Sequence, residues 1–159
     1  MTAWASTGLE GLDKILCDLK KGDNVVWQVD SVEDYSHFVG PYIDKALEDK
    51  RSIVYMRFAQ HGPLVESRPN VTVYELDAKG GFESFSTQVH TIISREGAET
   101  YYVFDCLSDL LIAWATDLMV GNFFKVACPY LFELDTIAYF AILRNHHSHQ
   151  TVARIRETT

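Results

Sequence analysis

The stretch NVVWQVDSVEDYSHFVGPYIDKAL, residues 24–47, decides the fold. Residues 24–29 form an apolar run that is typical of a buried strand. From Val32 onward, apolar residues recur at helical spacing as far as Leu47. A strand that turns directly into an amphipathic helix is the basic unit of an α/β domain.

Further apolar runs predict more strands along the chain. They are SIVYMRF (52–58), VTVYEL (71–76), residues 101–104 before Asp105, and TIAYFAIL (136–143). Helical patterns lie between most of them. This alternation predicts a single α/β domain of three αβα layers, with helices on both faces of a mainly parallel sheet. The length of 159 residues fits one such domain.

Two prolines fall inside predicted helices. Gly40-Pro41 predicts a kink or a break in the first long helix, and Pro129 predicts that the helical stretch after residue 107 restarts there. Four aromatic residues of this second stretch have helical spacing: Phe123, Phe124, Tyr130 and Phe132. The simplest interpretation is that they are core residues, although those that the core does not need are also compatible with a surface that faces a partner.

Composition narrows the classes of partner. The net charge is −8 and the sequence pI is about 5.1, so an overall repulsion is expected from a nucleic-acid backbone. The three cysteines show no paired spacing and are read as reduced thiols, and no secretory signal or membrane-spanning run is present in the sequence. We therefore expect a cytoplasmic protein that binds neither nucleic acid nor membrane.

Three segments together resemble the RecA superfamily, in particular its KaiC-like ATPase domains. The first is TGLEGLD (7–13), followed by Lys21-Gly22 and a strand, which is similar to the family's TG-x-x-GLD opening. The second is SIVYMRF, and the third is YYVFDCLS (101–108), whose Asp105 matches the Walker-B-like aspartate of the family. The resemblance implies a RecA-like sheet, in which the 136–143 strand lies between the strands that end at Asp30 and Asp105.

More narrowly, VVWQVDSVEDY, YVFDCLSDL, CPYL and LRNHHS resemble the N-terminal module of phosphoenolpyruvate-synthase-like proteins. In that family such a module precedes a PEP/pyruvate-binding domain of the ATP-grasp type. The resemblance implies that residues 1–159 are a single degenerate RecA/KaiC-like domain and an N-terminal segment of a longer polypeptide. It also implies that the parent protein is an ATP-dependent phosphotransferase acting on pyruvate, with this chemistry in the downstream part. The implied partners are downstream domains, other subunits or further copies of the chain.

The sequence departs from the ATPase pattern where nucleotide would bind. A phosphate loop needs glycines, whose backbone N–H groups approach the phosphates, and a lysine, but residues 30–37 (DSVEDYSH) contain neither. Ser31 is placed to cap the helix instead, with carboxylates around it. Ala59 and Gln60 stand where the family has a pair of glutamates. We therefore expect a catalytically silent interaction or regulatory domain, with no catalytic residue and no cofactor.

A second hypothesis uses the polar residues that follow the strands. Parallel strands present their carboxyl ends together, and ligands gather there. The candidate ligand-binding residues are Asp30, Arg57, His61, Asp105, Arg144 and His146. On this alternative the chain is a small-molecule-binding domain or an enzyme with a pocket at Asp30, Asp105 and His146. The competing structural interpretation is that Arg144 offsets the charge of buried carboxylates.

Two other kinds of site are not expected. His146, His147 and His149 are close in sequence, but neighbouring histidines of one loop rarely converge on one metal ion, and no supporting motif is present. Ser108 and Asp109 with a distant histidine lack the glycines of a nucleophile elbow, so no hydrolase triad is predicted.

Overall fold

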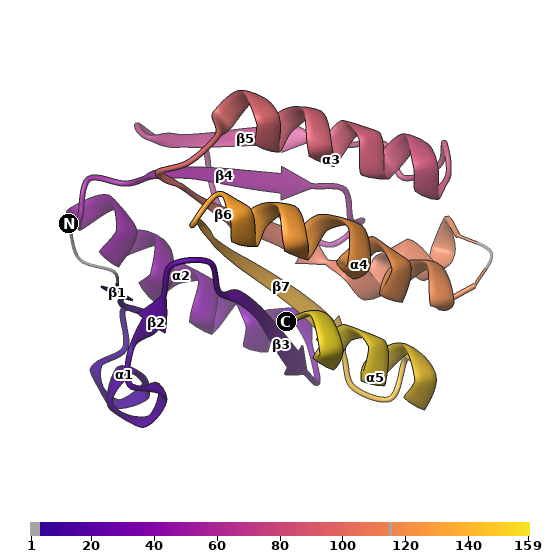
Figure 1. Cartoon of the computed structure of the whole chain (residues 1–159), viewed down its shortest axis with the longest axis horizontal. Helices are drawn as coiled ribbons and strands as arrows, with labels where there is room; N and C mark the ends of the chain where they lie inside the picture. The colour runs from indigo at the N-terminus through magenta and orange to yellow at the C-terminus, as the bar shows by residue number, and fades with distance from the viewer. Residues whose placement is uncertain (1–3, 115) are drawn as a thin grey trace.

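The computed structural model describes residues 4–114 and 116–159, and its centre is a five-stranded parallel sheet (Figure 1). The strand order is β3-β7-β6-β4-β5. The chain is thus an α/β domain, as predicted, and the last strand lies between the strands that precede Asp30 and contain Asp105. The strands of this sheet are β3 (Asn24–Val29), β4 (Ser52–Arg57), β5 (Val71–Glu75), β6 (Thr100–Cys106) and β7 (Ile137–Leu143).

Helices cover both faces of the sheet. On one face lies α2 (Val32–Glu48), and on the other lie α3 (Phe82–Glu96), α4 (Leu118–Glu133) and α5 (His149–Thr158). A 3₁₀ helix, η1 (Leu107–Ile112), follows β6 directly. The N-terminal part forms a small antiparallel pair, β1 (Trp4–Ala5) with β2 (Leu19–Lys20), and between them α1 (Glu10–Leu16) projects from the domain (Figure 1).

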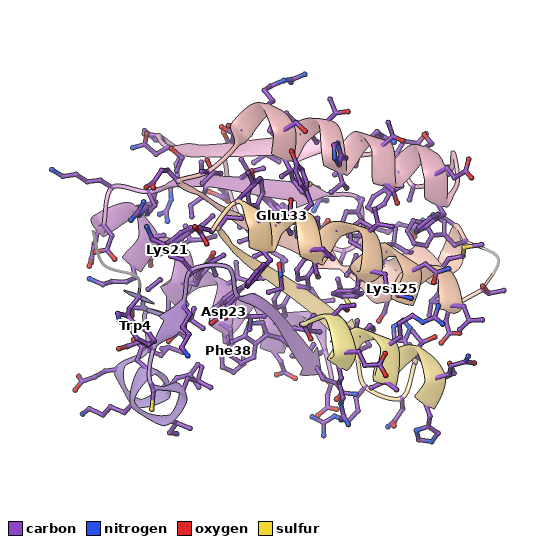
Figure 2. The ribbon with its side chains drawn as sticks, viewed as in Figure 1. Trp4, Lys21, Asp23, Phe38, Lys125 and Glu133 are labelled. Atoms are coloured by element: carbon purple, nitrogen blue, oxygen red, sulfur yellow. The ribbon has the colours of Figure 1, made fainter. Side chains whose placement is uncertain are left out.

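The central strands supply two separate cores because successive strand residues point to opposite faces. In β4, Ile53 and Tyr55 pack toward α2, whereas Val54 and Met56 pack toward α3 and α4. Side chains fill the space between the sheet and the helices (Figure 2). Phe38 of α2, labelled in Figure 2, stacks on the edge-strand Trp27, with ring centroids 4.0 Å apart.

The predicted break at Gly40-Pro41 and the predicted restart at Pro129 are wrong. Pro41 lies within the continuous helix α2, and Pro129 lies within α4, which begins at Leu118. An interior proline costs about 3 kcal/mol in helix stability. Fully buried residues flank each proline, for example Tyr42 in α2 and Leu131 in α4. Tertiary packing on both sides of the proline therefore outweighs its local cost.

The TGLEGLD segment is held by Asp13. Its Oδ1 accepts hydrogen bonds from the backbone N–H of Thr7 (2.7 Å) and from the Thr7 hydroxyl (2.6 Å), and Oδ2 accepts from Ser6. Gly8 adopts φ +82°, and a Cβ atom there would lie 2.1 Å from the carbonyl oxygen of Pro41. Glycine is thus required for this turn to reach the backbone of α2.

Candidate functional site

The junction of β3 and α2 is closed by a helix cap. Ser31 is the N-cap, and its Oγ accepts a hydrogen bond from the backbone N–H of Asp34 at 3.2 Å, as the sequence predicted. Glu33 and Asp34 lie in the first helical turn. Carboxylates are favourable at the positive end of the helix dipole, so the chain itself supplies the negative charge at this position.

Asp30 and Arg144 meet at the carboxyl ends of the neighbouring strands β3 and β7. The Arg144 Nε lies 3.3 Å from the Asp30 Oδ1, and both side chains are more than half exposed. The backbone N–H of Arg144 also continues the β3–β7 ladder by donating to the Val29 carbonyl. This is a surface ion pair. The interpretation that Arg144 offsets buried carboxylates is wrong, because its partner Asp30 is exposed and the buried Asp105 is bonded elsewhere.

Asp105 is fully buried at the end of β6, and both of its oxygens are used. Oδ1 accepts a hydrogen bond from the hydroxyl of Tyr55, and Oδ2 accepts from the backbone N–H groups of Phe58 and Ala59, each at 3.0 Å. Burial raises the pKa of Asp105, and these hydrogen bonds oppose that rise. The carboxylate therefore ties β6 to β4 and to the loop after β4.

The loop after β4, residues 58–64, is braced by further polar contacts. The Nε2 of His61 accepts a hydrogen bond from the Cys106 N–H at 3.3 Å, and its Nδ1 lies 2.8 Å from the Gly62 carbonyl. The same Nε2 lies 3.7 Å from the Oδ1 of Asp105. Arg57 donates to the His61 carbonyl at 3.0 Å. These three candidate residues form one internal network.

Sequence reasoning missed a second polar network, which joins Ser108, His147 and Asp117. The Ser108 Oγ lies 2.7 Å from the His147 Nε2 and accepts a hydrogen bond from the Leu143 N–H at 2.8 Å. The His147 Nδ1 lies 3.9 Å from the Asp117 Oδ2, beyond hydrogen-bond distance. Burial of the ring lowers the pKa of His147. Burial therefore favours the neutral form of this imidazole.

Ser108, His147 and Asp117 follow one another in space as the members of a Ser-His-Asp triad do. Their hydrogen bonds, however, connect secondary-structure elements to one another. Asp117 accepts a hydrogen bond from the backbone N–H of Ser148 at 2.6 Å, at the start of α5. Asp109, the acid considered from the sequence, instead accepts from the Gln60 N–H at 3.0 Å. Ser108 is only 6% exposed. The network therefore joins η1, the end of β7 and the first turns of α4 and α5.

Two of the three neighbouring histidines, His146 and His147, have different hydrogen-bond partners. The Nδ1 of His146 lies 2.9 Å from the Arg144 carbonyl, whereas His147 bonds to Ser108. Within residues 4–114 and 116–159, no three histidine, cysteine or acidic side chains are grouped as metal ligands would be. The six candidate residues therefore lie in separate surroundings: an exposed ion pair, the internal Asp105 network, and the exposed turn at His146.

A cavity of about 420 Å³ lies beside the turn after β7, between the edge of the sheet and α5. Its walls come from the ends of β3 and β7 and from one side of α5, and Asp30, Asp105 and His146 are not among them. The lining residues are Gln28, Leu143, Asn145, His147, His149, Val152, Ala153 and Arg156.

A comparison with models of protein families and with curated proteins found no match to this chain. Over the described parts of the chain, no helix combines the length and the apolar character needed to cross a membrane.

Proposed function

We propose that this chain is a catalytically silent RecA/KaiC-like domain with an interaction or regulatory role. In the proposed setting it belongs to a phosphoenolpyruvate-synthase-like or pyruvate-phosphate-dikinase-like protein, whose kinase chemistry lies in other domains. The basis for the family is the sequence resemblance of the TGLEGLD, SIVYMRF and YYVFDCLS segments. The basis for catalytic silence is the hydrogen bonding of Asp105 at the end of β6, together with the N-cap and the carboxylates in the first turn of α2 after β3.

The main support for the proposal is the burial and hydrogen bonding of the Asp105 carboxylate. In an ATPase of the resembled family, the equivalent aspartate serves the nucleotide's metal ion. Here both carboxylate oxygens accept hydrogen bonds from Tyr55 and from the backbone of the 58–64 loop, and the side chain is fully buried. Metal binding at Asp105 would require these bonds to break, which would leave buried donors without partners.

The start of α2 supports the same conclusion. An anion site at a helix N-terminus uses free backbone N–H groups. Ser31 already accepts a bond from one of them, and Glu33 and Asp34 place negative charge beside the others. A triphosphate would meet electrostatic repulsion at this end of the helix.

The surface supports an interaction role. Three large apolar side chains are mostly exposed, on three separate elements: Ile15 on α1, Ile112 on η1 and Phe132 on α4. Phe132 belongs to the aromatic group that the sequence left as either core or partner-facing surface, whereas Phe123 and Phe124 of that group are fully buried. We propose that the exposed side chains Ile15, Ile112 and Phe132 contact other domains or subunits.

Isothermal titration calorimetry with Mg·ATP tests catalytic silence. We expect no binding heat up to millimolar ATP and no phosphate release in a coupled assay. Micromolar binding by the isolated chain would contradict the proposal. For the interaction role, a purified PEP/pyruvate-binding domain of this kind would be mixed with the chain and with a Phe132→Ser variant. Analytical ultracentrifugation should show a complex that the substitution weakens.

A further inference from the structure

The segment from Arg144 to Arg156 differs in charge from the rest of the chain. Its sequence is RNHHSHQTVARIR, with three arginines, three histidines and no acidic residue, although the whole chain has a net charge of −8. The segment forms the turn after β7 and nearly all of α5. Its arginines are positive charges on an acidic chain, and an arginine without an acidic partner attracts an anion.

The three arginines of this segment have different partners. Arg144 pairs with Asp30, and Arg154 donates a hydrogen bond to the Asn122 side chain at 2.6 Å. Arg156 forms no ion pair or side-chain hydrogen bond with any other residue that the structure describes, and it lines the cavity between β3 and α5. Its guanidinium therefore has donors to offer to a ligand.

The cavity combines an apolar wall with polar groups. Leu143 of β7 and Val152 of α5 give it an apolar side, while Asn145, His149 and Arg156 bring hydrogen-bond donors. Its volume of about 420 Å³ suits a small organic molecule. Figure 1 shows α5 beside the carboxyl end of β3, at the end of the sheet where ligands of α/β domains gather.

We infer that this cavity binds a small organic anion, a phosphate or carboxylate group attached to an apolar body. Arg156 binds the anionic oxygens, which its planar donors match in geometry. His149 and Asn145 add hydrogen-bond donors, and the apolar body packs on Leu143 and Val152. The site does not depend on the proposed loss of ATPase activity, and it is separate from the candidate residues Asp105, Arg57 and His61.

Two-dimensional ¹H–¹⁵N NMR of the whole chain tests this site with three probes. Phenyl phosphate and benzoate carry the two anionic groups on the same apolar body, and benzyl alcohol carries no charge. We expect phenyl phosphate, benzoate or both to shift the amide signals of Gln28, Asn145, Val152 and Ala153, with saturation in the millimolar range or below. Benzyl alcohol should bind at least about tenfold more weakly, because it lacks the charged hydrogen bonds.

The variant Arg156→Ala should weaken binding of the anionic probes by about tenfold or more. Arg95→Ala removes an exposed arginine near the end of α3 and should leave the affinity unchanged. Circular dichroism of both variants checks that the fold is intact. The inference is overturned if neither anion shifts these signals, if benzyl alcohol binds equally well, or if Arg156→Ala binds like the unaltered chain.

Discussion

Replacing Asp105 with alanine gives a direct test of the internal network at the end of β6. The substitution removes the acceptors of the Tyr55 hydroxyl and of the Phe58 and Ala59 N–H groups. Each buried donor left without a partner costs about 1–3 kcal/mol, and water can reach the two backbone groups, which are only partly buried. We therefore expect a loss of about 3 kcal/mol in the free energy of unfolding.

In thermal denaturation this loss corresponds to a fall of about 6–12 °C in Tm for a domain of this size. Asp109→Ala is the matched control, because Asp109 also bonds to the 58–64 loop, through the Gln60 N–H, but at an exposed position. Its cost should stay at or below about 1 kcal/mol. Hydrogen exchange of the Phe58 and Ala59 amides should accelerate in Asp105→Ala alone.

Asparagine at position 105 separates the charge from the hydrogen bonds. Because burial raises the pKa of Asp105, the folded chain holds this proton more tightly than the unfolded chain, and ionisation of the buried group costs stability as pH rises above about 3.8. Asp105→Asn avoids that cost. Its stability relative to the unaltered chain should improve as pH rises from 3 to 7 and should exceed that of Asp105→Ala at pH 7.

Two results would refute this reasoning. A Tm of Asp105→Ala within about 2 °C of the unaltered chain would show that the buried bonds contribute little. A difference between Asp105→Asn and the unaltered chain that did not change with pH would show that the Asp105 carboxyl titrates alike in the folded and unfolded chains.

Three further outcomes are expected. Ser31→Ala should lose about 1 kcal/mol in urea denaturation, because the N-cap bond of α2 is removed, whereas an unchanged midpoint would argue against the cap. Gly8→Ala should lower the free energy of unfolding by at least about 2 kcal/mol, because the φ of +82° and the nearby Pro41 carbonyl exclude a Cβ atom. Gly11→Ala in α1 is the control: a Cβ atom there meets nothing within 4 Å, so this variant should be neutral or stabilising in the same assay. Burial lowers the pKa of His147, so the unfolded chain takes up this proton more readily and stability should fall as pH drops below about 6.5; His147→Gln should flatten that slope in thermal melts between pH 5 and 7, and equal slopes would contradict the prediction.

Local patterns were enough to predict much of the fold. The apolar run before Asp30 and the helical spacing after Val32 identified β3 and α2, because residues of one face repeat every two positions in a strand and about every 3.6 in a helix. Ser31 was recognisable as a cap from its place between these two patterns. The order of β3, β7 and β6 followed from the family resemblance rather than from the patterns.

The candidate site was predicted less completely. Sequence placed Asp30, Asp105 and Arg144 at one end of the sheet, since each follows or ends an apolar strand, but it could not assign their partners. Tyr55 and Asp105 are separated by 50 positions, and Ser108 and His147 by 39. Arg144 and His146 of the LRNHHS segment were candidates from the sequence, but the cavity beside this segment was not predicted, because its lining also includes Gln28, which is more than 100 positions away in the sequence.

The sequence by itself determined the class of the domain, its main elements and the absence of a phosphate-loop motif, because these depend on the spacing and identity of residues near one another in the chain. Only the tertiary structure decided that Asp105 is bonded to the 58–64 loop, that Pro41 and Pro129 remain within helices, and that Arg156 faces a cavity. These outcomes depend on strand register and on packing between distant segments. Such interactions add or remove several kcal/mol at a position without leaving a local pattern.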